Sequence, residues 1–148
     1  MEEFNTIDKV IELFKEKNYY EEENNIFIAY KDLQKSNGMV SGMEYPYEGL
    51  IINETNKGLA MIPLKQPGIV LTQTVNKMEI DKSKEIIFIP KENIINITIK
   101  NFALLNSKVK RISIKTNDKK NYLLFARIIE KSIPYQEENF TKFINNNK

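Results

Sequence analysis

The sequence contains neither cysteine nor histidine. Without cysteine there is no thiolate nucleophile, no disulfide framework and no thiolate metal site. Without histidine the usual Ser–His–Asp and Cys–His systems cannot be built, and zinc sites almost always need one of these two residue types. There are only five glycines, and neither GxxxxGK[ST] nor GxGxxG occurs. We therefore expect a non-catalytic protein with no cofactor and no metal ion.

Long apolar segments are also lacking. The longest apolar runs, such as residues 86–89, are far shorter than the roughly 18–20 residues needed to span a bilayer. The N-terminal residues MEEF are acidic, whereas a secretory signal begins basic and continues apolar. Together with the absence of cysteine, these features predict a cytoplasmic protein.

Carboxylate pairs are the one remaining route to acid–base chemistry. Glu79, Asp81 and Glu85 are the candidates, but they lie among lysines in a polar stretch, which is typical of a solvated surface turn. The run Glu21-Glu22-Glu23 lacks the spacing of a calcium loop and is interpreted as a linker. An enzyme using carboxylates or lysine alone is the least favoured class.

The hydrophobic pattern changes from helical to strand-like near residue 25. Residues 4–17 place Phe4, Ile7, Val10, Ile11 and Phe14 on one face of an amphipathic helix. The next segments alternate with a period of two, and residues 136–145 again have the apolar stripe of a helix. The interval 69–80 is ambiguous. The seven expected strands are 26–33, 47–53, 58–64, 85–89, 94–100, 109–116 and 120–127.

Short, regularly spaced strands separated by tight turns indicate an antiparallel barrel or sandwich. We predict an α+β, mainly β fold: a seven-stranded antiparallel barrel capped by a C-terminal helix, with an additional N-terminal amphipathic helix. The expected division is an N-terminal helix and acidic linker over residues 1–24, followed by the barrel domain over residues 25–148.

Three segments of the chain resemble the bacterial pleckstrin-homology-like (PH-like) domain and the related GRAM domains. They are the hairpin YEGLII (47–52) to GLAMIPL (58–64), the segment IPKENIINI (89–97), and KRISIKT (110–116) followed by YLLF (122–125). The resemblance covers roughly residues 25–146. It implies a bent seven-stranded barrel closed at one end by the C-terminal helix, and a protein that binds lipid head groups, peptides or partner proteins.

Charge is distributed unevenly along the chain. Residues 1–24 carry a net charge of −5, and residues 100–131 carry a net charge of +7. Four basic residues form a candidate site for an anionic ligand, and we expect Arg111 and Lys115 to share the outward face of their strand while Ile112 and Ile114 face the core. Such a patch would suit an anionic membrane surface, or it is a solubilising edge. The four residues are Lys108, Lys110, Arg111 and Lys115.

A second candidate site is the loop 34–47. Met39, Met43, Tyr45 and Tyr47 lie between glycines there, and adaptable methionines with amphipathic tyrosines suit a peptide-binding surface. The same side chains could instead fold back over the mouth of the barrel. We expect no nucleic-acid partner, because stacking surfaces need exposed aromatics among the basic residues.

The sequence thus predicts a binding module for a protein or peptide, with peripheral attachment to anionic lipids as the alternative. Lipid-binding relatives carry a basic signature across their first two strands, whereas residues 31–53 offer only Lys31 and Lys35. The apolar face of helix 4–17 needs a partner. Docking on its own barrel is favoured over a homodimer through this helix, and insertion into a membrane surface comes last, because the helix is acidic.

Overall fold

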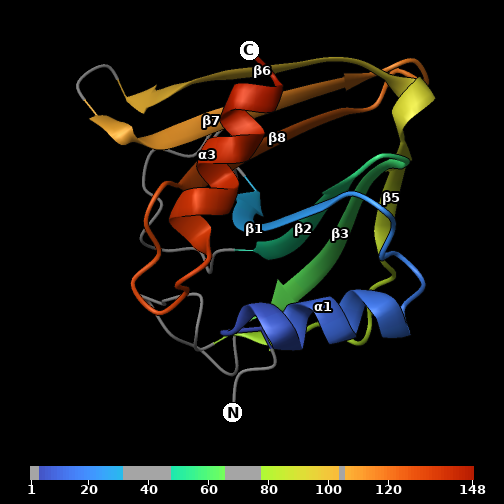
Figure 1. Cartoon of the computed structure of the whole chain (residues 1–148). Coiled ribbons are helices and arrows are strands. Elements are labelled where there is room, and N and C mark those ends of the chain that lie inside the picture. The colour runs from blue at the N-terminus through green and yellow to red at the C-terminus, as the bar shows by residue number, and fades with distance from the viewer. Residues whose placement is uncertain (1–3, 32–47, 66–77, 104–105) are drawn as a thin grey trace.

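The computed structural model describes residues 4–31, 48–65, 78–103 and 106–148 (Figure 1). These residues form a mainly β structure in which one helix precedes the strands and another follows them. In chain order the elements are α1 (Ile7–Glu16), β1 (Asn24–Lys31), β2 (Gly49–Thr55), β3 (Gly58–Lys65), β4 (Glu79–Ile80), β5 (Ile87–Pro90), the 3-10 helix η2 (Lys91–Asn93), β6 (Ile94–Ala103), β7 (Asn106–Thr116), β8 (Asn121–Arg127) and α3 (Gln136–Asn146).

All strands are antiparallel and belong to one sheet. Its order is β4-β3-β2-β1-β8-β7-β6, and β5 also pairs with β3. The prediction of a seven-stranded closed barrel is wrong in two respects. The described residues form eight strands, because the short β4 adds to β3, and the sheet is open, since β6 at one end does not pair with β4 or β5 at the other.

The sheet divides into two halves where β1 meets β8. These strands share only two residue pairs, Tyr30 with Phe125 and Lys31 with Leu124, whereas β1 and β2 are paired along their whole length. We call strands β1–β5 the first half-sheet and strands β6–β8 the second half-sheet. Figure 1 shows the two halves diverging from this junction, with α3 lying in the opening between them.

Two amide side chains of α3 take the place of a neighbouring strand along β1. The Gln136 Oε1 accepts the Ile28 N–H at 2.8 Å, and its Nε2 donates to the carbonyls of Ile28 at 3.0 Å and Arg127 at 2.8 Å. One turn later the Asn139 Nδ2 donates to the Ile26 carbonyl at 2.8 Å. The backbone groups of Ile26 and Ile28 in β1 are therefore satisfied without a longer β1–β8 ladder.

The first half-sheet is buried on both faces. On one face α1 contributes Val10 and Phe14, which are fully buried in a cluster with residues of β1, β2 and β3. On the other face Phe140 and Phe143 of α3 lie against Phe27, with ring centroids 5.3 and 4.6 Å apart. Burial on both faces explains the nearly continuous apolar runs at 26–30, 50–52 and 59–62. The N-terminal helix therefore docks on its own chain, as favoured from the sequence.

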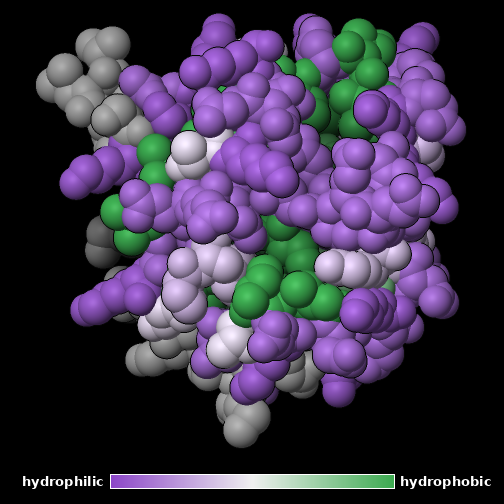
Figure 2. Space-filling view, viewed as in Figure 1, coloured by the Kyte–Doolittle hydropathy of each residue, from purple (hydrophilic) through white to green (hydrophobic). Residues whose placement is uncertain are grey.

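The second half-sheet buries one face in the core, and Phe125 of the opposite face is buried next to Tyr30 of β1. Ile112 and Ile114 of β7 are buried on the core face, as predicted, and Ile97 and Ile99 of β6 pack against the same cluster. Ile95 differs from the expected alternation: the β6–β7 register shifts between Ile94 and Asn96, and Ile95 is 62% exposed. Figure 2 shows the face seen in Figure 1 as mostly hydrophilic, with a smaller apolar area between α3 and α1.

The turn between β2 and β3 is shorter than the sequence predicted. Thr55 pairs with Gly58, so the loop is only Asn56-Lys57. The Thr55 hydroxyl oxygen accepts the N–H groups of Lys57 at 3.1 Å and Gly58 at 3.2 Å, and its O–H donates to the Gly58 carbonyl. Gly58 has φ +149°, a backbone conformation that favours glycine.

Candidate functional site

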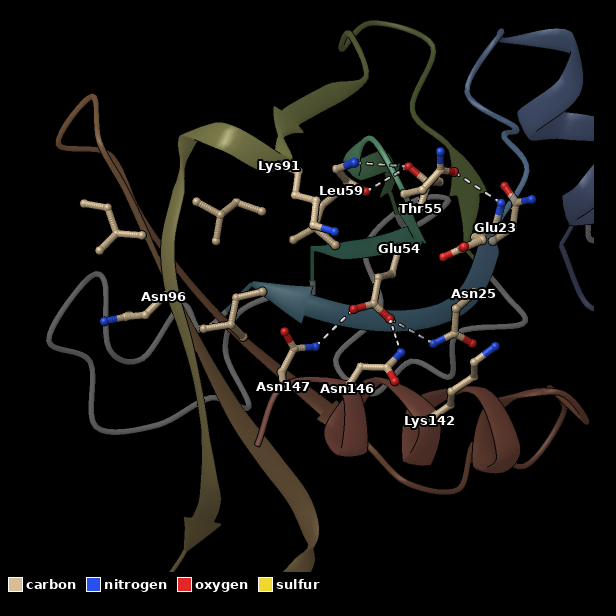
Figure 3. A pocket seen from close by; sticks show the side chains of 16 residues that line it. Glu23, Asn25, Glu54, Thr55, Leu59, Lys91, Asn96, Lys142, Asn146 and Asn147 are labelled. Carbon is tan, nitrogen blue, oxygen red and sulfur yellow. Dashed lines mark hydrogen bonds between the residues drawn. The ribbon is translucent and has the colours of Figure 1, made fainter.

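A groove of about 590 Å³ lies on the side where the sheet is open, beside the free edge of β6. It is bordered by β6, the β2–β3 turn and the C-terminal end of α3 (Figure 3). Apolar side chains from β3 and β6 line part of it, and asparagine side chains make up half of the remaining lining residues. We call this site the seam groove. Its lining consists of Glu23, Asn24, Asn25, Glu54, Thr55, Asn56, Gly58, Leu59, Lys91, Ile94, Ile95, Asn96, Ile97, Lys142, Asn146 and Asn147.

Strand β6 borders the groove with an edge that pairs with no other strand in the described part of the chain. The Ile128 N–H donates to the Lys108 carbonyl at 2.9 Å and the Thr116 N–H donates to the Lys120 carbonyl at 3.2 Å. The backbone N–H and C=O groups of the even-numbered residues of β7 therefore bond to β8. Because the pattern alternates along an antiparallel ladder, the odd-numbered residues of β7 bond to β6.

The same alternation identifies which backbone groups of β6 face outward. Thr98 is paired with Ser113, and Lys100 with Arg111, so Thr98 and Lys100 are the residues that bond to β7. The N–H and C=O groups of Ile97 then point away from β7, toward the free edge. The Ile97 side chain, in contrast, packs on the core and lines the groove.

Glu54 presents a carboxylate to the groove. Its Oε1 accepts from the Nδ2 groups of Asn25 at 3.4 Å and Asn146 at 3.1 Å, and its Oε2 accepts from the Asn147 Nδ2 at 3.1 Å. Figure 3 shows these three amides converging on Glu54 from β1 and from the end of α3. Among the described residues, no lysine or arginine nitrogen lies within 4.0 Å of this carboxylate. Neutral amides therefore fix the position of a charge that has no counter-ion within 4.0 Å in the described part of the chain.

Other charged side chains surround the groove without changing its net charge. Lys91, Lys142 and Glu23 also line it, so together with Glu54 the lining carries two positive and two negative charges. Lys57, on the adjacent turn, is paired with Glu21 at 3.1 Å. Positive and negative side chains therefore lie in the same groove, and their charges sum to zero. The groove has no net charge that would attract ligands of one sign.

The predicted peptide-binding residues Met39, Met43, Tyr45 and Tyr47 lie outside the described residues. Their role stays a prediction, and the structure adds the seam groove as a second candidate.

The four predicted basic residues do not share one surface. Arg111 lies on the outer face of the second half-sheet, where its guanidinium is 4.7 Å from the centroid of the Phe102 ring, and Lys115 has the same strand parity. Lys110 is on the opposite face, and its Nζ donates to the Asn101 Oδ1 at 2.7 Å. Lys108 lies beside the irregular pairing near the β6–β7 connection.

Asp81, one of the three carboxylates considered for acid–base work, makes structural contacts. The Asp81 Oδ1 accepts the Ser83 N–H at 3.0 Å and the Ser83 O–H at 2.5 Å, and this hydroxyl contact holds the pKa of Asp81 below its usual value. A lowered pKa makes Asp81 a poorer proton donor at neutral pH. No group of three or more acidic residues that could hold a metal ion occurs within the described ranges.

A buried ionisable cluster, which the sequence did not reveal, lies where β1 meets β8. The Arg127 guanidinium is 5.2 Å from the centroid of the fully buried Tyr30 ring, and its Nη1 is 3.6 Å from the Glu130 Oε2. Burial raises the pKa of Glu130, and Arg127 opposes that rise. Burial, with the nearby Glu130 charge, also raises the pKa of Tyr30. Because Tyr30 and Glu130 are buried, we interpret the cluster as structural.

Searches against family models, curated proteins and solved structures find no match to this chain. None of the helices in the described segments is long and apolar enough to cross a membrane. The functional argument therefore depends on the geometry of the seam groove.

Proposed function

We propose that this chain is a non-catalytic, cytoplasmic binding module of PH-like architecture that holds an extended segment of a partner protein as an added strand along β6. The observation that carries the proposal is that β6, a ten-residue strand beside a groove, has one edge that pairs with no other strand of the described residues. The bent antiparallel sheet with a C-terminal helix in its opening supports the resemblance to PH-like domains.

Strand addition satisfies both the backbone and the side chains of an extended ligand. Its N–H and C=O groups pair with the outward groups of Ile97 and Ile99, which gives affinity that depends little on sequence. Alternate ligand side chains point to one face, so every second residue is directed into the seam groove. There the apolar side chains of Leu59, Ile94 and Ile97 provide a surface for a buried contact.

Amide hydrogen exchange tests this mode of binding residue by residue. The full chain is first used to select ligands from a displayed library of random decapeptides. In the free protein we expect the N–H groups of Ile97 and Ile99 to exchange rapidly and that of Thr98, bonded to β7, to exchange slowly. A selected peptide should slow exchange at Ile97 and Ile99 and leave Thr98 unchanged. Selected peptides that leave Ile97 and Ile99 unprotected, or a selection that yields none, would contradict the proposal.

A second candidate function is peripheral attachment to an anionic membrane. One observation favours it: Lys100 of β6 pairs with Arg111, and on the outer face it adds a third base to Arg111 and Lys115. Each such residue contributes about 1 kcal/mol near an anionic surface.

Flotation with phosphatidylserine-containing liposomes at low salt tests the membrane function. We expect the Arg111→Glu/Lys115→Glu double variant to lose flotation, and the matched Lys110→Glu/Lys142→Glu variant, away from this face, to keep more of it. Equal loss in both variants would show that only net charge matters. Absence of flotation in the unaltered protein would eliminate the membrane function.

A further inference from the structure

We infer that the partner segment carries a lysine or arginine whose cationic group pairs with Glu54 in the seam groove. This inference rests on the proposed strand addition along β6 and specifies the chemistry of the bound segment. It follows from the charge state of the groove, from the geometry of Glu54 and from the apolar surface between Glu54 and β6.

Within the described ranges Glu54 has no counter-ion within 4.0 Å, in contrast to Glu21 and Glu48. Glu21 is 3.1 Å from Lys57, and Glu48 is 3.4 Å from both Lys31 and Lys84. Around Glu54 the described residues supply only amide donors. A peptide lying over the groove would remove water from this carboxylate, and an uncompensated charge is costly once desolvated. A cation brought by the peptide offsets that cost, whereas an apolar or acidic side chain does not.

The amides hold the carboxylate in place and still leave room for another donor. A carboxylate can accept about four hydrogen bonds, and Glu54 accepts three. Because Asn25 is on β1 and Asn146 and Asn147 are at the end of α3, the carboxylate is fixed from two directions. A fixed acceptor favours binding, since little side-chain freedom is lost when the cation arrives.

The apolar part of the groove suits the long stem of a basic side chain. Glu54 belongs to β2 and lies across the groove from β6 (Figure 3), and Leu59 and Ile97 are among the residues lining the space between. Lysine and arginine bury their methylene groups along apolar surface while keeping the charged end in a polar setting. One side chain can therefore contact the apolar lining and reach the carboxylate.

The two lysines of the lining limit this selection to a single position. Lys91 and Lys142 disfavour further bases nearby, and the four lining charges sum to zero. We therefore expect one strongly basic position in the bound segment and only a modest dependence of affinity on salt, in contrast to the steep dependence of a basic membrane-binding face.

The test compares decapeptide selections by three proteins: the unaltered chain, Glu54→Gln, and Glu23→Gln as the matched control in the same groove. We expect a fixed basic position with the unaltered chain and with Glu23→Gln, and its loss with Glu54→Gln. Replacing that base by glutamine in a selected peptide should weaken binding to the unaltered chain by about tenfold or more. The same replacement should have little effect on binding to Glu54→Gln.

The outcomes separate this inference from the proposed function. Peptides that protect the Ile97 and Ile99 amides but show no basic position, or a base selected equally by Glu54→Gln, overturn the pairing and leave strand addition intact. Absence of any peptide that protects these amides removes both. If Glu54→Gln proves unfolded by circular dichroism, the peptide with glutamine in place of the base still decides the pairing on the unaltered chain, because a loss of affinity below twofold overturns it.

Discussion

At the scale of single residues, Gly58 shows how one position controls the border of the groove. A Cβ added there would lie 2.1 Å from the Ile89 carbonyl oxygen, and its φ is +149°. Both the contact and the backbone conformation oppose a side chain, so we expect Gly58→Ala to destabilise the fold by about 2–4 kcal/mol. Chemical denaturation would measure this loss.

Gly49→Ala is the matched control for that substitution. Its Cβ would meet the Sδ of Met78 at 2.9 Å and the Cδ1 of Leu64 at 3.2 Å. These atoms belong to flexible side chains and not to the backbone, so we expect a smaller loss than for Gly58→Ala. Equal losses for the two variants would contradict the assignment of a special backbone role to Gly58.

Glu130 should make stability depend on pH. Burial raises its pKa in the folded state, so the folded protein binds a proton more readily than the unfolded chain does. The stabilisation from this proton is complete below the unfolded pKa and is lost as pH rises through the folded pKa. We expect Glu130→Gln to raise the melting temperature at pH 8 by a few degrees, for a gain on the order of 1 kcal/mol, and to change it little at pH 4. A larger gain at pH 4 than at pH 8 would contradict this prediction.

The sequence predicted residue roles where they depend on local alternation and missed those set by distant contacts. It placed Ile112 and Ile114 in the core and Arg111 and Lys115 outward, because strand periodicity decides these directions. Nothing local marks Glu54, whose amide partners are 29, 92 and 93 residues away in the sequence. Such a site can be identified only when the fold is known, because it combines side chains of β1, β2 and the end of α3.

At the scale of elements, α3 acts as a substitute for a strand. Gln136 is fully buried, and its amide makes three hydrogen bonds, two with Ile28 and one with Arg127. We expect Gln136→Leu, which keeps most of the volume, to leave the Ile28 N–H and C=O unsatisfied and to cost about 2–5 kcal/mol. Thermal or urea unfolding would measure this. Thr141→Ala, at an exposed position of the same helix, should change stability by less than about 0.5 kcal/mol.

The sequence predicted nearly all helices and strands, but it did not predict that the sheet is open. Hydrophobic periodicity located both helices and the main strands to within a few residues. The two halves diverge where the short β1–β8 ladder ends. Beyond that point the amides of Gln136 and Asn139, more than a hundred residues after β1, bond to the backbone of β1. Periodicity within a segment carries no information about side chains that bond to a strand in place of a neighbouring strand. The expectation of a closed barrel came from the resemblance to PH-like domains.

At the scale of the whole molecule, the two hydrophobic clusters share the first half-sheet and should unfold together. Phe14 belongs to the cluster under α1, and Phe143 to the cluster under α3. Each replacement by alanine should cost about 3–5 kcal/mol and should shift one common transition, because β1 contributes to both clusters. Far-ultraviolet circular dichroism and tyrosine fluorescence, followed during urea unfolding, should report the same midpoint.

Ile7→Ala is the control for these core variants, since Ile7 is 37% exposed and should contribute little. Two separate transitions, one shifted only by Phe14→Ala, would show instead that α1 unfolds independently of the sheet, as a separate N-terminal unit over residues 1–24 would.

Amide side chains of α3 take the place of a strand beside β1, and this arrangement affects how long the nascent chain is prone to aggregate during synthesis. β1 leaves the ribosome with its edge unsatisfied, and the side chain that satisfies Ile28 is 108 residues further along the chain. Until Gln136 emerges, the nascent β1 exposes hydrogen-bonding groups to any neighbouring nascent chain. A ribosome stalled before this point would therefore hold a strand that can pair between chains, so polysomes translating this message would need protection by chaperones until α3 emerges.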